Sequence, residues 1–524
     1  LFLLDRPLEA PYFRGNVISH REMNRLVRRA ASVLQSLGVK RGDRIALATL
    51  NRIELAFVEF GAQRLGAIPV PLNFMLTVDE IRQIVERCGA KMLVTDRTVF
   101  EKNIRERSRL PSIERWMMVT SQAVPDGFES FDARMEAATE DVEPIEIADE
   151  EPALIFFTAG TTGTPKGAVL TSGGLMDSFR RYARLASILP TPKRRLALLV
   201  MPMAHTSGHQ HLLVQMALGT PCLLMGSFDP ERILDHIEKY RVSLFAGIPT
   251  MYRMLLDSGA EQRDLSSVRL WGGGGDAFPH DLVQKFRSFS TRGFGPFKRK
   301  AAFITGYGLA ETAGQVSITL PFALGDNCIG WLMPGVRSRL VDAEGKDVPH
   351  GDVGELILRT PGLMQGYWND PEGTQTALRD GWFYTGDLMR KGKWGLKYFV
   401  SREKEMIKVG GYSVFPAEVE KVLDSHPDVE RSVVVGLPHP TKGELPVAGV
   451  VTGAGSRITE RDLEVWISER VAPYRCPRRV VFIEEIPQNF SMKPLRRLVR
   501  DRLIEQGIKV ESRSDRERKR VSAS

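Results

Sequence analysis

Residues 153–167 read ALIFFTAGTTGTPKG and form the most informative stretch of the sequence. The apolar run Ala153–Phe157 predicts a short buried strand. The segment that follows, Thr158–Gly167, combines glycines, hydroxyl groups and a lysine. Glycines let backbone N–H groups approach a ligand closely, hydroxyls donate hydrogen bonds and lysine adds positive charge, so the segment suits a chain of phosphates. It is not a Walker loop, because Lys166 lies between Pro165 and Gly167 instead of preceding Ser or Thr.

Helix and strand patterns alternate on both sides of this loop. Two helices are predicted to begin at capping boxes, Ser19 with Glu22 and Thr77 with Glu80. The predicted helices upstream of the loop are 19–37, 54–65 and 77–88, and the predicted strands are 45–50, 67–71 and 92–95, with another strand downstream at 242–245. The alternation predicts an α/β fold of mostly parallel sheets covered by helices on both faces.

The length of the chain, 524 residues, predicts more than one hydrophobic core. Gly, Pro and charged residues cluster at 392–411, and a new unit follows with helices at 416–423 and 462–470 and strands at 429–435 and 480–483. We therefore predict a large N-terminal domain at 1–403 and a smaller α+β C-terminal domain at 404–510. The remaining residues, 511–524, are mostly charged, lack apolar periodicity and are predicted to form a basic, disordered tail.

The composition excludes several classes of protein. With 43% hydrophobic and 26% charged residues, the chain reads as globular. A net charge of +8 without a basic, aromatic-rich patch argues against nucleic-acid binding and is compatible with polyanionic small molecules. No long apolar run or secretory signal is present, so we expect no transmembrane helix and a cytoplasmic location. Oligomerisation is possible but is not encoded in any heptad pattern. The cysteines are expected to be reduced and buried, without metal-ligand spacing, at Cys88, Cys222, Cys328 and Cys476.

Together with other motifs, the loop Thr158–Gly167 resembles the phosphate loop of the adenylate-forming superfamily, which includes acyl-CoA synthetases, peptide-synthetase adenylation domains and firefly luciferase. The other motifs that carry the resemblance are MPMAHTSG at 201–208, GYGLAET at 306–312, GEL at 354–356 with GYW at 366–368, WFYTGDL at 382–388, SREKE at 401–405, Gly410-Gly411 and SMKP at 491–494. The resemblance spans nearly the whole chain and is specific, because the motifs occur in the family's order.

The resemblance implies a two-step activation of a carboxylic acid. A carboxylate resists nucleophiles, but its attack on the α-phosphorus of ATP expels pyrophosphate and installs AMP as a good leaving group. A thiol, that of coenzyme A, then displaces AMP. The implied co-substrates are ATP and coenzyme A, with Mg²⁺ as the metal. Catalysis of this kind depends mainly on positioning and electrostatic stabilisation.

The resemblance also implies a nucleotide site. Tyr307 would stack on adenine, Asp387 would accept the ribose hydroxyls with help from Arg402, and Glu311 would bind Mg²⁺. The phosphates would be held by Thr158, Gly160, Thr161, Thr162, Gly163 and Lys166. The other implied nucleotide contacts are Gly274, Gly275, Asp276, Gly308 and Thr312. The alternatives are structural: a core tyrosine, a turn-forming aspartate and a solvated glutamate.

The implied catalytic set is Lys493, Glu311, Lys166 and His205. Lys493 would bridge the substrate carboxylate and the α-phosphate, while His205 would line or gate the acyl pocket unless it is simply a core histidine. In the second step the C-terminal domain would rotate about Lys404 and bring Gly410 and Gly411 to coenzyme A. The predicted acyl pocket comprises His205, Ser207, His209, Ile248, Pro249, Gly273, Gly306 and Leu309. Because this set contains no Lys, Arg or Asp, a fatty or aromatic acid is expected.

Four positions depart from the family pattern: Ala159, Ala310, Ser401 and Met492. A lost hydrogen bond to a charged group costs about 1.5–3 kcal/mol, so we expect a working enzyme with altered kinetics. Three alternatives remain open. The acceptor could be a carrier-protein thiol, the chain could bind adenylate without catalysis, or it could be a luciferase-like oxygenase.

Overall fold

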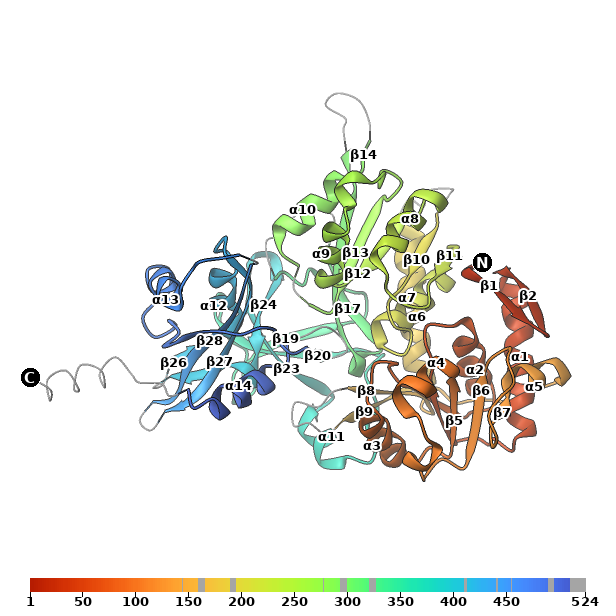
Figure 1. Cartoon of the computed structure of the whole chain (residues 1–524). Helices are drawn as coiled ribbons and strands as arrows, with labels where there is room; N and C mark the ends of the chain where they lie inside the picture. The colour runs from red at the N-terminus through yellow and green to blue at the C-terminus, as the bar shows by residue number, and fades with distance from the viewer. Residues whose placement is uncertain are drawn as a thin grey trace, which may run out of the picture. The chain divides into compact units, whose positions relative to one another are not determined.

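The computed structural model describes residues 1–143, 145–158, 165–188, 195–276, 278–292, 299–319, 327–409, 412–439, 442–453, 455–488 and 494–508 (Figure 1). The chain forms two compact units. Unit 1 contains Leu1–Ser338 and Leu358–Tyr384, and unit 2 contains Arg339–Ile357 and Thr385–Ser524. The unit limits fall inside three strands, β19 (Arg337–Val341), β20 (Val353–Arg359) and β23 (Trp382–Lys391). A hinge between domains can lie at a different position from the boundary between two compact units. The domain boundary at Lys404 therefore stays a prediction.

One sheet of unit 1 is entirely parallel, with strand order β4-β3-β5-β6-β7. Its strands are β3 (Arg44–Ala48), β4 (Ile68–Pro71), β5 (Met92–Asp96), β6 (Arg115–Val119) and β7 (Glu129–Ser130). The helices of this region are α1 (His20–Ser36), α2 (Ile53–Arg64), α3 (Val78–Cys88), the short α4 (Arg97–Val99) and α5 (Phe131–Ala137). Strands β3, β4 and β5 are buried almost throughout, as expected when helices cover both faces of a parallel sheet.

The second sheet of unit 1 has the order β18-β17-β16-β13-β12-β10-β11-β1-β2. Its strands are β1 (Phe2–Ala10), β2 (Phe13–Ile18), β10 (Ala197–Leu199), β11 (Cys222–Leu224), β12 (Leu244–Gly247), β13 (Leu270–Gly274), β16 (Ala302–Leu309), β17 (Gly314–Ile318) and β18 (Trp331–Leu332). In the sheet, the six neighbouring strands β16, β13, β12, β10, β11 and β1 pair in parallel. Antiparallel strands extend the sheet at both ends, β17 and β18 beside β16 and β2 beside β1. The associated helices are α6 (Ser172–Ile188), α7 (Thr206–Leu218), α8 (Pro230–Tyr240), α9 (Pro249–Asp257) and α10 (His280–Ser288). The predicted α/β class is therefore confirmed.

Unit 2 contains a five-stranded sheet of order β26-β25-β28-β27, with β29 paired to β28. The strands are β25 (Ile407–Val409), β26 (Tyr412–Val414), β27 (Val429–His439), β28 (Gly443–Thr452) and β29 (Val480–Phe482), and the helices are α12 (Pro416–Leu423), α13 (Glu460–Ser468) and α14 (Arg496–Glu505). Most strand pairs here are antiparallel, so the predicted α+β character is confirmed. The remaining elements are β8 (Pro152–Thr158), β9 (Lys166–Thr171), β14 (Thr291–Arg292), β15 (Arg299–Lys300), β19 (Arg337–Val341), β21 (Gly366–Tyr367), α11 (Pro371–Ala377), β22 (Leu378–Arg379) and β24 (Lys397–Arg402).

The predicted helix starts are confirmed with one difference. Thr77 and Glu80 form a complete capping box, and Gly89 ends α3 in the left-handed region with a φ of 66°. Ser19 accepts a hydrogen bond from the backbone N–H of Glu22, but the carboxylate of Glu22 binds Arg25 instead of returning to the cap. The strand predicted at 242–245 is displaced to Leu244–Gly247, because the N–H of Val242 bonds the carbonyl of Ile237 and closes α8.

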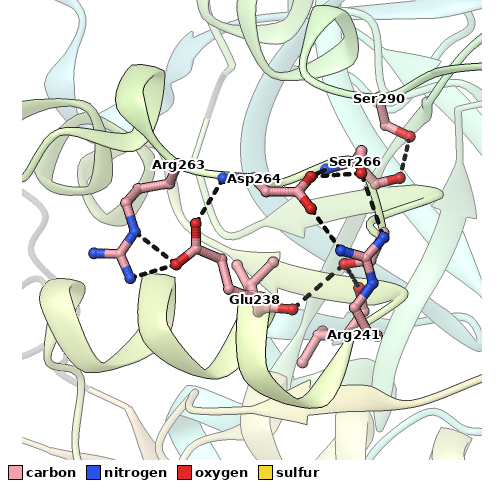
Figure 2. Close-up of polar contacts among 9 residues, drawn as sticks. Glu238, Arg241, Arg263, Asp264, Ser266 and Ser290 are labelled. Carbon is pink, nitrogen blue, oxygen red and sulfur yellow. Dashed lines mark hydrogen bonds and ion pairs between the residues drawn. The ribbon is translucent and has the colours of Figure 1, made fainter.

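An exposed network joins the end of α8 to the segment that leads into β13 (Figure 2). The two carboxylate oxygens of Glu238 accept hydrogen bonds from Nε of Arg263 at 2.8 Å and from the backbone N–H of Asp264 at 2.7 Å. Arg241 donates to Asp264 at 2.6 Å. Hydrogen bonds from Ser266 and Arg241 lower the pKa of Asp264 to about 2. We call Asp235, Glu238, Arg241, Arg263, Asp264 and Ser266 the exposed network.

The cysteines follow the prediction closely. Cys88, Cys222 and Cys328 are buried, Cys476 is half-buried, and all four are free thiols. Burial raises the pKa of Cys88 to about 11 and that of Cys222 to about 12, so these thiols are unreactive. None of the helices in the described part of the chain is both long and apolar enough to cross a membrane.

Candidate functional site

The carboxyl ends of three parallel strands bring many of the predicted residues together in unit 1. β13 lies between β12 and β16, with Gly247 opposite Gly273 and Gly274 opposite Gly306. Ligands of open α/β sheets bind outside such strand ends. The predicted residues at or just beyond these ends are Ile248, Pro249, Gly273, Gly274, Gly275, Asp276, Gly306, Tyr307, Gly308 and Leu309.

Glycine is required where these strands meet. A Cβ atom at Gly274 would lie 2.7 Å from the carbonyl oxygen of Gly306. A Cβ at Gly308 would lie 2.3 Å from the carbonyl oxygen of Gly314 in the facing strand β17. The glycines of the GYGLAET motif therefore serve close backbone packing at the same edge where a ligand would bind.

The predicted phosphate loop joins two antiparallel strands. β8 and β9 form a hairpin in which Thr158 faces Lys166, and the hydroxyl of Thr158 bonds the carbonyl of Lys166 at 3.4 Å. A Walker loop would lead into a helix, so the hairpin agrees with the sequence interpretation. Gly160, Thr161, Thr162 and Gly163 lie outside the described residues, as does Ala159.

Lys166 and Glu311 contact the same tyrosine, Tyr367. The Lys166 ammonium lies 4.9 Å from the ring centre of Tyr367 and 3.7 Å from Oδ2 of Asp370. The hydroxyl of Tyr367 donates to Oε1 of Glu311 at 2.9 Å. Glu311 is 8% exposed, and its backbone carbonyl accepts from the N–H of Met364. Tyr367 therefore contacts the Lys166 ammonium through its ring and the nearly buried Glu311 carboxylate through its hydroxyl.

The oxygen atoms of Glu311 can be compared with the ligands that a magnesium ion prefers. In the described residues no three His, Cys, Asp or Glu side chains gather as a complete metal cage. Mg²⁺ in nucleotide sites instead uses one or two carboxylates together with substrate phosphates and water. Only one oxygen of Glu311 bonds Tyr367, so the other suits such a role, and the residues fit a magnesium–nucleotide ion.

Two predicted residues lie in the interior. Thr312 is fully buried, and its hydroxyl donates to the carbonyl of Gly314 at 2.7 Å, so it shapes the turn between β16 and β17. His209 is 4% exposed, and its Nε2 lies 2.6 Å from Oε1 of Glu59. Thr312 was predicted in the nucleotide site and His209 in the wall of the acyl pocket. In the structure both side chains already have protein partners.

His205 caps the N-terminus of α7. Its Nδ1 accepts from the backbone N–H of Ser207 at 3.3 Å and lies 2.9 Å from the Ser207 hydroxyl. Nδ1 is therefore engaged in the cap of the helix. This geometry suits a pocket wall better than a base acting through Nδ1.

Asp387 and Arg402 come together in unit 2. They face each other across β23 and β24, and Nε of Arg402 lies 2.8 Å from Oδ1 of Asp387. Asp387 is 1% exposed, and its backbone N–H bonds the hydroxyl of Thr385. Lys404 is exposed in the short 3-10 turn Glu403–Glu405.

The positions that depart from the family pattern have different surroundings. Ala310 is buried in an apolar cluster with Leu154 and Phe156, and Ser401 is buried with its hydroxyl bonded to the carbonyl of Arg402. Met492 lies outside the described residues, together with Lys493, Gly410 and Gly411.

Sequence reasoning did not assign roles to Tyr367 and Asp370. Tyr367 belongs to the GYW motif, but its contact with Glu311 joins residues 56 positions apart. The only signal for Tyr367 was its place in the GYW motif. Gln315, which lies three residues beyond the GYGLAET motif, had no sequence signal.

The family of the chain follows from comparison with known proteins. The model described as "AMP-binding enzyme" matches residues 5–368, and "AMP-binding enzyme C-terminal domain" matches 418–493. A feruloyl-CoA synthase from Amycolatopsis sp is 33% identical over 495 residues, 93% of this chain and 94% of the relative. A fatty acid–[acyl-carrier-protein] ligase, ScoC, from Streptomyces coeruleorubidus is 31% identical over 93% of this chain and 92% of its own.

Solved structures of similar proteins support the same family. ATP-bound MatB from Rhodopseudomonas palustris has a TM-score of 0.82 and 27% identity, covering 93% of this chain and 94% of that one. The o-succinylbenzoate CoA synthetase of Bacillus subtilis, solved with its acyl-adenylate intermediate, has a TM-score of 0.80 and 25% identity, covering 95% of each. The chain therefore belongs to the AMP-binding enzymes of the adenylate-forming superfamily.

Proposed function

We propose that the chain is an ATP-dependent carboxylic acid–CoA ligase. It converts a carboxylate and ATP to an acyl-adenylate and pyrophosphate, and it then transfers the acyl group to the thiol of coenzyme A. The observation that carries the proposal is the grouping of Lys166, Tyr367 and Glu311 in a chain whose family is the AMP-binding enzymes. The named CoA ligases and synthases among its relatives support coenzyme A as acceptor.

The first step needs two anions to approach each other. The carboxylate oxygen attacks the α-phosphorus, and the bond to the pyrophosphate oxygen breaks with its electron pair leaving on pyrophosphate. Lys166 places positive charge beside the leaving phosphates, and Glu311 would hold Mg²⁺ through the oxygen that Tyr367 does not bond. When bound, Mg²⁺ neutralises phosphate charge. Lys493 would bridge the carboxylate and the α-phosphate.

The family resemblance also assigns residues to the nucleoside. Tyr307 would stack on adenine, with the backbone of Gly274, Gly275 and Asp276 alongside. Asp387, which Arg402 orients, would accept hydrogen bonds from the ribose hydroxyls. In the second step a hinge at Lys404 would bring Gly410 and Gly411 to the pantetheine arm of coenzyme A.

The substrate is proposed to be an aromatic or fatty acid. The predicted pocket residues contain no Lys, Arg or Asp that would pair with a second charged group. Names among the relatives include feruloyl-CoA synthase and 4-coumarate-CoA ligase, which supports an aromatic acid.

A second candidate acceptor is a carrier-protein thiol, because the ScoC relative is named for a carrier-protein product. The test is pyrophosphate release with ATP and Mg²⁺ across fatty and aromatic acids, with and without coenzyme A. Turnover that requires both one acid class and coenzyme A supports the ligase. Acid-dependent release that coenzyme A does not accelerate favours a carrier protein, and no release with any acid contradicts both.

A further inference from the structure

Gln315 is anchored at two points inside unit 1. It lies in β17 opposite Gly308 of β16. Its backbone N–H donates to Oε1 of Gln210 in α7 at 3.0 Å. Its side-chain Oε1 accepts a hydrogen bond from the hydroxyl of Tyr182 in α6, also at 3.0 Å. Because Gln210 and Tyr182 are only 7% and 6% exposed, both anchors belong to the packed interior.

The other end of the Gln315 amide faces the strand ends. A Cβ atom built at Gly306 would lie 2.1 Å from Nε2 of Gln315, and one at Gly274 would lie 3.9 Å away. Gly274 and Gly306 are paired where β13 and β16 end. The amide nitrogen therefore lies across the glycines that border the proposed ligand site, with no hydrogen-bond partner among the described residues.

The contact with Tyr182 orients the amide. The Tyr182 hydroxyl donates to Oε1 at 3.0 Å, and burial, which raises the pKa of this hydroxyl, keeps it protonated. Nε2, with its two hydrogens, is then turned toward Gly306. Gln315 is half-buried, so this donor is accessible to water and to a ligand at the strand ends.

We propose that Gln315 is a specificity-determining residue whose amide donates a hydrogen bond to a neutral oxygen on the acyl part of the substrate. The acids selected would carry a hydroxyl, methoxyl or carbonyl oxygen at the end that meets Gly306. A second carboxylate fits less well, because a buried anion needs a cationic partner and the predicted pocket supplies none. This inference rests on the proposed function and narrows its substrate class.

The primary test compares paired acids with the full-length enzyme. Cinnamic acid is compared with its 4-hydroxy and 4-methoxy derivatives, and octanoic acid with 8-hydroxyoctanoic acid. The enzyme is expected to prefer at least one oxygenated member. Gln315→Met, which keeps the length but removes the donor, is expected to lower the ratio of kcat/KM values for that pair about ten-fold or more.

Two further variants separate recognition from folding. Tyr182→Phe removes the anchor but not the donor, so the same ratio should fall by a smaller factor of about three. Gln315→Glu keeps an acceptor for Tyr182 and removes the donor, so it should lose the preference as Gln315→Met does. Gln262→Met changes an exposed glutamine of the same unit and should leave the ratio as in the parent.

Equilibrium binding provides a readout that does not depend on turnover. Non-hydrolysable acyl-sulfamoyl-adenosine analogues of the same acid pair should bind with the parent's preference to the Gln262→Met control and with a reduced preference to both Gln315 variants. Equal loss for every acid, or an unchanged ratio in both Gln315 variants, would overturn the inference. A failure of the proposed function would look different. Without adenylation no acid would release pyrophosphate, and with a carrier-protein acceptor release would still depend on the acid but coenzyme A would not accelerate it.

Discussion

Two polar regions of unit 1 differ in how completely their groups are paired. In the exposed network, each carboxylate of Glu238 and Asp264 accepts several hydrogen bonds (Figure 2). The other region, here called the buried polar face, comprises Tyr182, Gln210, His211, Gln215 and Gln315. Among the described residues, Nε2 of Gln210, Oε1 of Gln215 and both ring nitrogens of His211 have no hydrogen-bond partner.

The difference separates two uses of polar residues. Paired charges on the surface connect one element to the next and are worth little individually. Buried polar groups without partners are costly, so a protein keeps them where they bind something or hold a binding group in place. By this criterion we expect the buried polar face, in which Tyr182 and Gln210 anchor Gln315, to affect ligand binding, and the exposed network to affect only the scaffold.

The largest effect is expected when the proposed magnesium ligand changes. Glu311→Gln keeps the shape but removes the charge, and we expect adenylate formation to fall about 100- to 1,000-fold. ATP–pyrophosphate exchange at several Mg²⁺ concentrations measures this loss. Asp264→Asn, a matched change in the exposed network, should exchange at the parent rate. An equal loss of adenylate formation in the two variants would contradict the assignment of Glu311 to the active site and of the exposed network to the scaffold.

An acid-dependent loss of stability is expected from the buried polar face. Burial lowers the pKa of His211 from 6.5 to about 4. The unfolded chain therefore binds a proton as the pH falls below about 6.5 while the folded chain does not, and stability declines between about pH 6.5 and 4. The full effect is about 3 kcal/mol. Denaturant unfolding should show a shallower acid decline in His211→Leu, and identical pH profiles would contradict the prediction.

A smaller kinetic effect is expected at Tyr367. Tyr367→Phe keeps the ring beside Lys166 but removes the hydroxyl that bonds Glu311. One lost hydrogen bond to a charged group should slow adenylate formation about ten-fold and raise the Mg²⁺ concentration needed for half-maximal rate. Titration of Mg²⁺ at fixed ATP measures both. A variant with normal magnesium dependence would show that Tyr367 does not position Glu311.

The smallest effect is expected in the exposed network. The folded pKa of Asp264, about 2, lies below its ordinary value of 3.8, so its contribution to stability is present above about pH 4 and is lost as the pH falls toward 2. Because the side chain is largely exposed, Asp264→Asn should cost less than about 1 kcal/mol at neutral pH. Thermal unfolding in low and high salt measures this cost, which salt should reduce. A larger loss of stability that salt does not reduce would contradict the prediction that the exposed network contributes little to stability.

The fold could be predicted from local patterns to the extent that each pattern has a local cause. Thr77 and Glu80 set the start of α3, and Pro416 sets the start of α12. The strand near 244 was misplaced by two residues because the turn after Arg241, in the left-handed region, uses Val242 to close the helix. A hydrogen bond of this kind is not visible in hydrophobic periodicity.

The candidate site was predictable only where the family motifs name a residue. Asp387 and Arg402 were assigned to one function, and the structure pairs them. The links from Tyr367 to Glu311 and from Tyr182 to Gln315 span 56 and 133 positions. Their partners are determined by how strands and helices pack, so no local sequence pattern could reveal them.

The most direct test of the account follows the oxygen atoms of the acid. The enzyme would be given an aromatic or fatty acid labelled with ¹⁸O in its carboxylate, together with ATP, Mg²⁺ and coenzyme A, and the AMP would be analysed by mass spectrometry. If the carboxylate attacks the α-phosphorus and the thiol then displaces AMP, each AMP carries one ¹⁸O atom and a thioester forms in equal amount. Unlabelled AMP, or ADP as the nucleotide product, would contradict the acyl-adenylate mechanism.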